Sequence, residues 1–188
     1  ICLAHDLGHT PFGHAGQDAL NACMREFGGF EHNLQSLRVV DELEERYAGF
    51  NGLNLTFETR EGILKHPASW EHPVPRPDRS GQMPLEAQAA DRSDEIAYTN
   101  HDLDDGLDAG LLNEGELNDR VTVWREAARK VQREHGELPD ECRRYFIIRT
   151  MIDGQVRDVV LTTEKLINRA GVQSADAVRL HPRPLVQY

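Results

Sequence analysis

Hydrophobic residues along the chain recur mainly at the spacing of an α-helix. Leu34, Leu37, Val40 and Leu43 follow one another at three-residue steps, which predicts an amphipathic helix continuing to about residue 47. Further helices are expected over residues 15–26, 57–65, 85–103, 117–134 and 140–169, the last either continuous or broken near residues 153–154. The pattern therefore predicts an all-α, mainly helical fold.

Turn-forming residues separate these helices. Residues 1–8 are expected to form the end of an apolar helix, and the glycines and proline of residues 8–13 then bend the chain. Gly28-Gly29 is expected to stop the next helix. Thr56 has the side chain of an N-cap and predicts that a helix begins at residue 57.

The length of 188 residues suits a single domain. Residues 66–84 hold five of the nine prolines and predict an irregular loop rather than a second domain. A later helical region is expected over residues 111–188, with a β-prone Leu185-Val186 near its end. Because the chain opens at Ile1 and its first motif follows at once, we expect a partial domain whose upstream helices are missing.

The composition of the chain limits which partners and which cellular setting it suits. A net charge of −11 argues against a broad nucleic-acid-binding face, although divalent metals allow an acidic protein to act on anionic substrates. The three cysteines are far apart and form no CxxC motif, which predicts a reducing, cytoplasmic setting. No stretch is long and apolar enough to predict a membrane span, and the first residues lack the pattern of a signal peptide.

The densest chemical signal is the string HDLGHTPFGH at residues 5–14, which holds three histidines and an aspartate. Adjacent His5 and Asp6 offer an imidazole nitrogen and a carboxylate oxygen, a donor set suited to Mn²⁺, Fe²⁺, Mg²⁺ or Zn²⁺. The alternative is a polar helix end with chance histidines. The concentration of imidazoles favours a metal-centred hydrolase site.

A second signal lies in the helix expected over residues 85–103. Asp94, Tyr98 and Asp102 are four residues apart, so they share one helix face along about 12 Å. A metal ligand at one end with substrate-binding groups beyond it would use this spacing, whereas a solvated acidic face is the alternative. Only the histidine string at residues 5–14 makes the metal and substrate site the better interpretation of this spacing.

Four extended motifs resemble one enzyme family. Their sequences are AHDLGHTPFGHAG (4–16), GGFEHNLQSLR (28–38), GLNLTFETREGILKH (52–66) and SDEIAYTNHDLDDGL (93–107). In this order they resemble the deoxyguanosine triphosphate triphosphohydrolases of the HD phosphohydrolase superfamily. That resemblance implies a helical HD-domain fold, a divalent metal cofactor, and cleavage of deoxynucleoside triphosphates to a deoxynucleoside and inorganic triphosphate.

The resemblance also assigns roles. It implies that His5, Asp6 and Asp94 are metal ligands and that His14 is the general acid at the leaving 5′-oxygen. His32 corresponds to a histidine that holds the α-phosphate region, and Tyr98 and Asp102 correspond to sugar contacts. It further implies a homo-oligomer for the complete protein and leaves open an allosteric deoxynucleotide, the preferred base and the metal's identity.

The chain departs from the family pattern in two ways. The family's first metal histidine lies upstream of the HD pair, where this chain has no residue, so three of four protein ligands are present. The family usually has a glutamate three residues after the active-site histidine, whereas this chain has Gln17, which can orient His14 but cannot stabilise an imidazolium. His9 either orients a metal ligand or caps the broken helix.

Two other functions compete with this hypothesis. Another HD phosphohydrolase, such as a 5′-nucleotidase or a phosphodiesterase, would share the metal residues but would not explain the longer motifs. A catalytically idle, nucleotide-sensing or nucleic-acid-associated subunit would use the pocket for binding only, and Gln17 is the feature that favours it.

Overall fold

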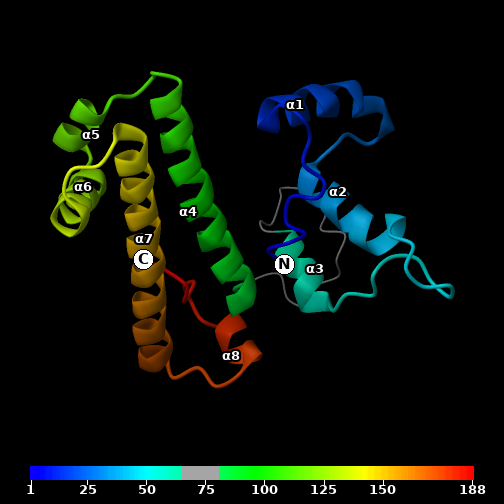
Figure 1. The fold of residues 1–188 in the computed structure, drawn as a ribbon. Coiled ribbons are helices and arrows are strands. Elements are labelled where there is room, and N and C mark those ends of the chain that lie inside the picture. Colours follow the sequence, from blue (N-terminus) through cyan, green and yellow to red (C-terminus); the bar gives the residue numbers. More distant parts are fainter. Residues whose placement is uncertain (65–80) are drawn as a thin grey trace. The chain divides into compact units, whose positions relative to one another are not determined.

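The structure is a computed structural model and describes residues 1–64 and 81–188 (Figure 1). Its regular elements in these residues are helices, with two isolated β-bridges and no strand. The all-α prediction is therefore confirmed. No helix in the described ranges is long and apolar enough to cross a membrane. Most of the proline-rich stretch, residues 66–80, lies outside the described residues.

The chain divides into two compact units. The first comprises residues 1–91 and 172–185. Its helices are α1 (Gly13–Cys23), α2 (His32–Arg38), α3 (Phe57–Ile63), α8 (Ala175–Arg179) and the start of α4 (Leu85–Asp108). Leu37, Val40, Ile63 and Leu64 form a buried cluster in this unit, so α2 and α3 pack together. The prediction of a single domain over residues 1–188 stays a prediction.

The second unit comprises residues 92–171 and 186–188. It contains the rest of α4 together with α5 (Glu114–Arg120), α6 (Thr122–His135) and α7 (Asp140–Ala170). Trp124, Val131 and Ile147 lie in its buried core, where α6 packs against α7. Gly154 does not break α7, because one glycine costs a helix only about 1 kcal/mol. The buried Ile147, Ile148 and Met151 also pack the helix just before it.

Three helix predictions were wrong in their bounds. Residues 117–134 form two helices rather than one, because Val121 adopts an extended conformation between them. The helix after Gly29 ends at residue 43 rather than 47, and its last part is a π-helical turn, η2 (Val39–Leu43). The long helix α4 continues to residue 108. Leu185 is buried, but no strand forms there, since its N–H donates to the Gln88 side chain 2.8 Å away.

The first eight residues do not form the predicted helix end. They make successive tight turns, in which the N–H of Ala4 donates to Ile1 and the N–H of Leu7 donates to Ala4. Each bond spans three residues instead of the four of an α-helix. The predictions downstream are confirmed: Gly28 and Gly29 have φ of 98° and 79° after the short 3₁₀ turn η1 (Arg25–Phe27). The Thr56 side chain caps α3.

Gly8 and Ser36 join this turn segment to α2. The Gly8 N–H donates to the Ser36 hydroxyl at 2.9 Å, and that hydroxyl donates to the His32 carbonyl at 3.0 Å. Ser36 is fully buried. A Cβ on Gly8 would lie 2.3 Å from the His32 carbonyl oxygen and 2.4 Å from the Ser36 nitrogen, so no larger residue fits. The contact fixes the register between residues 5–9 and α2.

We expect this contact to contribute measurably to stability. Ser36→Ala leaves the buried Gly8 N–H without its acceptor and should lower the free energy of unfolding by about 1–3 kcal/mol. Gly8→Ala should cost more, because its Cβ meets backbone atoms that cannot rotate away. Urea unfolding followed by circular dichroism measures both.

The control is Gly154→Ala on α7, where an added Cβ meets nothing within 4 Å. This change should raise the stability by up to about 1 kcal/mol, because alanine is the better helix former. A Gly8→Ala protein as stable as the wild type would contradict the close packing described here.

Candidate active site

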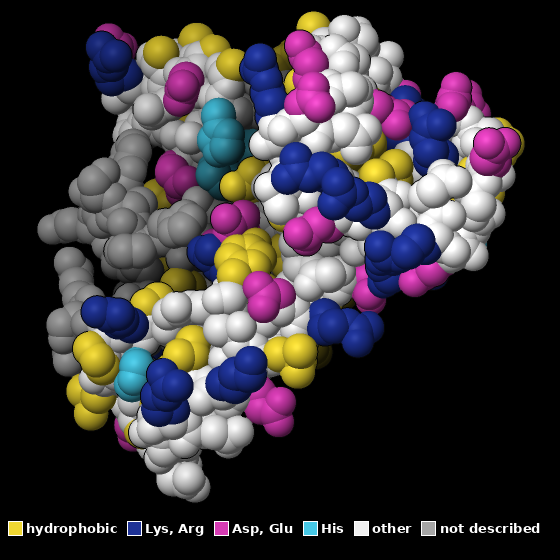
Figure 2. Space-filling model, turned by 90° about the vertical axis from the view of Figure 1, so that its left-hand side faces the viewer, with side chains coloured by type: hydrophobic (Ala, Val, Ile, Leu, Met, Phe, Trp, Pro, Cys, Tyr) yellow, Lys and Arg dark blue, Asp and Glu magenta, His cyan; other side chains and the backbone are white. Residues whose placement is uncertain are grey.

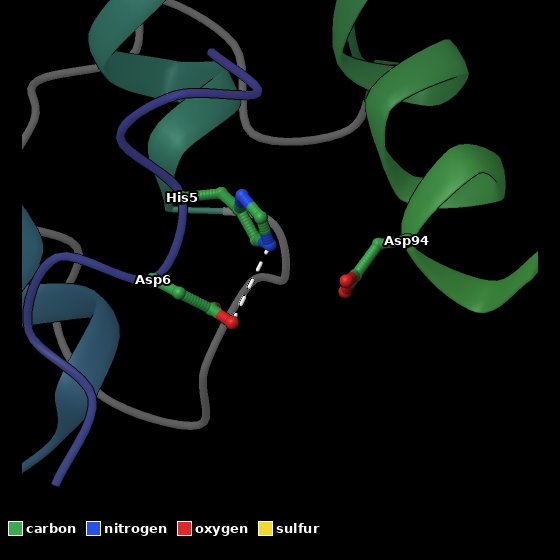
Figure 3. A group of neighbouring side chains, drawn as sticks. All are labelled: His5, Asp6 and Asp94. Carbon is green, nitrogen blue, oxygen red and sulfur yellow. Dashed lines mark ion pairs between the residues drawn. The ribbon is translucent and has the colours of Figure 1, made fainter. Parts of the chain in front are cut away.

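His5 and Asp6 lie next to each other in the turn segment (Figure 3). His5 Nδ1 lies 2.7 Å from the Cys2 carbonyl oxygen, which can only accept, so the neutral ring carries its proton on Nδ1. Its Nε2 then presents a lone pair 3.4 Å from Asp6 Oδ2. Two ligands about 2.0–2.2 Å from one divalent ion stand at a similar separation. The pair therefore has the donor chemistry and the spacing of metal ligands.

Asp94, Tyr98 and Asp102 lie on α4, in the part that belongs to the second unit. The helix places them on one face, as predicted, and Figure 3 includes the Asp94 carboxylate on this helix. Tyr98 is 55% exposed, and Asp102 is also exposed. Both side chains are thus accessible to a ligand. Their assigned roles stay predictions.

Three imidazole rings gather in the first unit. We call His9, His14 and His32 the histidine cluster. Its ring centroids are 5.5 Å apart for His9 and His14, 4.8 Å for His9 and His32, and 5.8 Å for His14 and His32. Residues 18 positions apart in the sequence are thereby brought within contact range. The cluster includes His9, for which the sequence left two roles open.

Each member of the histidine cluster comes from a different local structure. His9 follows the docked Gly8, and its N–H donates to the Asp6 carbonyl at 3.0 Å. His14 is in the first turn of α1, after Phe12, which adopts a left-handed conformation with φ of 66°. His32 is the first residue of α2. The bend that the sequence predicted over residues 9–14 thus turns two histidines toward the third.

Gln17 contacts His32 instead of the expected His14. Its Oε1 lies 3.0 Å from the His32 backbone nitrogen and 2.5 Å from His32 Nδ1. Because one oxygen receives both groups, Gln17 connects α1 to the start of α2. Within the described residues, no hydrogen bond joins Gln17 to His14. Glutamine in place of the family's glutamate at position 17 therefore acts on His32 and not, as expected, on His14.

Glu31 is a site residue that the sequence reasoning missed. It is the N-cap of α2, where its Oε2 accepts from the Leu34 N–H at 2.9 Å and its Oε1 accepts from the Asn33 amide at 2.9 Å. Its Oε1 also lies 3.3 Å from His32 Nδ1, and both side chains are largely buried. An acidic residue just after Gly28-Gly29 and before a helix was the available signal.

The surroundings of His32 favour its neutral form. Burial lowers the pKa of His32 below its ordinary value of 6.5, and this desolvation is the largest cause. Glu31 and Asp6 act in the opposite direction, while His9 and His14 lower the pKa further. His32 is therefore predominantly uncharged at neutral pH. A neutral imidazole can accept a proton, which an imidazolium cannot do.

Other cations near these elements have structural roles. Arg60 of α3 forms a double hydrogen bond to the Asp41 carboxylate at 2.7–3.0 Å. Arg179 of α8 pairs with the fully buried Glu61 at 2.5–3.1 Å. On the face shown in Figure 2, Lys and Arg side chains are interspersed with Asp and Glu. Among the described residues of the first unit, the histidine cluster is therefore the distinctive chemical feature.

Comparison with known proteins identifies the family of this chain. A family model described as HD domain matches residues 1–99. A deoxyguanosinetriphosphate triphosphohydrolase-like protein of Thiobacillus denitrificans is 51% identical over 198 residues, covering 100% of this chain and 51% of the relative. Proteins with the same description from Geobacter sulfurreducens and Ralstonia nicotianae are 48% and 53% identical, again over 100% of this chain and 49% of each relative.

The chain spans about half the length of the curated relatives it matches. The matched family segment includes the turn segment, the histidine cluster and the first part of α4 through Asp94 and Tyr98. It also covers more than half of the chain's residues. The chain therefore belongs to the HD domain family.

Proposed function

We propose that this protein hydrolyses deoxynucleoside triphosphates with the help of a divalent metal ion. The reaction cleaves the bond between the 5′-oxygen and the α-phosphorus, giving a deoxynucleoside and inorganic triphosphate. The observation that carries the proposal is the assembly of the His5–Asp6 pair and the histidine cluster within one unit of an HD-domain chain. The printed description of its relatives supports the choice of substrate class.

The metal ligands in this proposal are His5, Asp6 and Asp94. Each offers one ligand atom, and His5 has the neutral Nε2 lone pair that coordination needs. Asp94 follows Asp91, the last α4 residue of the first unit, by less than one helical turn. The mixed nitrogen and oxygen set suits Mn²⁺, Mg²⁺, Fe²⁺ or Zn²⁺. When bound, such an ion supplies Lewis-acid polarisation of the α-phosphate.

The histidine cluster acts on the phosphate and the leaving group. His14 is exposed in the first turn of α1, where it can deliver a proton to the leaving 5′-oxygen. His32 is held by Gln17 and contributes to the α-phosphate region. His9 lies between the HD pair and these two residues in sequence and contacts both rings.

Tyr98 and Asp102 bind the sugar in this proposal. They are one turn apart on α4, a rise of about 6 Å, which suits two contacts on one deoxyribose. The Asp102 carboxylate accepts a hydrogen bond from the 3′-hydroxyl. The Tyr98 ring packs at the 2′ position and disfavours a ribose hydroxyl there. The complete protein is proposed to act as a homo-oligomer, with a second deoxynucleotide as a candidate activator.

We expect turnover of deoxynucleoside triphosphates to yield inorganic triphosphate as the first product. The complete protein is incubated with each of the four substrates and with Mn²⁺ or Mg²⁺, and mass spectrometry identifies the products. Omitting the metal should abolish turnover, because the phosphate charge is then unscreened. Orthophosphate or a 5′-monophosphate as first product would contradict the proposal and favour another HD phosphohydrolase. Binding without turnover would favour a sensing subunit.

In the complete protein, we expect Asp94→Ala and Asp102→Ala to impair different steps, metal binding and substrate binding respectively. Asp94→Ala should lose the metal and lower kcat by at least about 100-fold, since loss of transition-state charge stabilisation costs several kcal/mol. Asp102→Ala should keep its metal and mainly raise KM, because the sugar contact is similar in the ground and transition states. Elemental analysis and steady-state kinetics separate the two roles. Full metal content and a wild-type rate in Asp94→Ala would make the ligand assignment wrong.

A further inference from the structure

The proton position on the His32 ring follows from its hydrogen bonds. Gln17 Oε1 receives the His32 backbone N–H, so this atom of the amide is the oxygen, which can only accept. The same oxygen lies 2.5 Å from His32 Nδ1, and the Glu31 carboxylate lies 3.3 Å from that nitrogen. Two acceptors therefore face Nδ1, and Nδ1 carries the proton of the neutral ring.

The opposite nitrogen is consequently a lone-pair acceptor. Within residues 1–64 and 81–188, His32 Nε2 has no hydrogen-bond or ion-pair partner. The ring itself contacts His9 and His14, so it stands among the groups assigned to the phosphate. We propose that His32 is a proton acceptor for the attacking water, and that Gln17 and Glu31 are the positioning residues that hold its Nε2 unprotonated. This inference rests on the proposed function.

The proton balance of the step gives the two histidines complementary roles. The water oxygen forms a bond to the α-phosphorus while one water proton passes to His32 Nε2. The bond between the α-phosphorus and the 5′-oxygen breaks, and the proton held by His14 passes to that oxygen. One proton is taken up and one is released, so no oxidant or further reactant is needed. A neutral His32 and a protonated His14 are the required starting states.

Glutamine at position 17 suits a neutral, proton-accepting His32 better than glutamate would. With glutamine at this position, Glu31 is the one carboxylate within 4 Å of the His32 ring among the described residues. A second carboxylate would favour the imidazolium, whose Nε2 is a donor. The charged groups that act on His32 are then Glu31 and Asp6, which raise its pKa, and His9 and His14, which lower it when protonated. The burial of the ring keeps it neutral against the two carboxylates.

The direct test needs neither metal nor substrate. The protein is labelled with ¹⁵N at histidine, and the His32 ring nitrogens are followed by NMR as the pH is lowered. We expect the neutral ring to carry its proton on Nδ1 and to titrate below the ordinary histidine pKa of 6.5. A neutral ring with its proton on Nε2 would overturn the inference. This outcome would leave the proposed function standing, because it concerns only the acceptor role of His32.

Two substitutions test the positioning residues. Gln17→Glu should raise the pKa of His32, because it adds a carboxylate beside Nδ1. Glu31→Gln should lower this pKa while keeping an oxygen to cap α2. The matched control is Gln132→Glu, an exposed residue of α6 in the second unit, which adds the same charge without any of the contacts that Gln17 makes to His32 and should leave the pKa of His32 unchanged. An unaltered pKa in Gln17→Glu would overturn the positioning role.

The metal-loaded protein supplies the second readout. If His32 accepts the proton, kcat falls at acid pH as His32 becomes protonated. This decline, the acid limb of the kcat–pH profile, moves to higher pH in Gln17→Glu. It moves to lower pH in Glu31→Gln. Acid limbs that stay in place while the NMR pKa values shift would overturn the acceptor role and leave Gln17 and Glu31 as structural contacts. A complete wild-type protein without turnover would instead overturn the proposed function, and the NMR result would still decide the tautomer.

Discussion

The docking of Gly8 against Ser36 is the constraint on which the site of the first unit depends. The turn segment is not a helix and has few buried side chains, so its own residues cannot hold it in place. A buried hydroxyl that accepts from Gly8 and donates to His32 links the HD pair to the helix that carries His32. Because backbone approaches backbone at this point, the register cannot slip without a clash.

The histidine cluster concentrates three ionisable rings within 6 Å of one another. Three imidazolium ions at that separation would repel one another strongly, so the arrangement is stable only when at least part of the cluster is neutral. Burial of His32 satisfies this condition, and Glu31 and Gln17 orient the neutral ring. The contacts of Glu31 and Gln17 that stabilise the histidine cluster therefore also determine that Nε2 of His32 faces a ligand.

Helix caps connect this chemistry to the local sequence. Glu31 both caps α2 and contacts His32 Nδ1, so one carboxylate begins the helix and orients its first residue. Gln17 has a similar double contact with the backbone and the ring of His32. Residues that seem to serve only secondary structure thus also shape the site. Glu31 was therefore not predicted as a site residue, because its sequence pattern is that of a helix cap.

The sequence by itself determined the helical class, the caps and breaks at Thr56 and Gly28-Gly29, and the His5–Asp6 pair, because these depend on neighbours within a few residues. The helix end over residues 1–8 was predicted wrongly, since the packing of Gly8 against α2 overrides local propensity. Only the tertiary structure decided that Gln17 contacts His32 and that Gly8 meets Ser36. Such contacts join residues 15 and 28 positions apart, and no local pattern specifies which partners meet when separate helices pack.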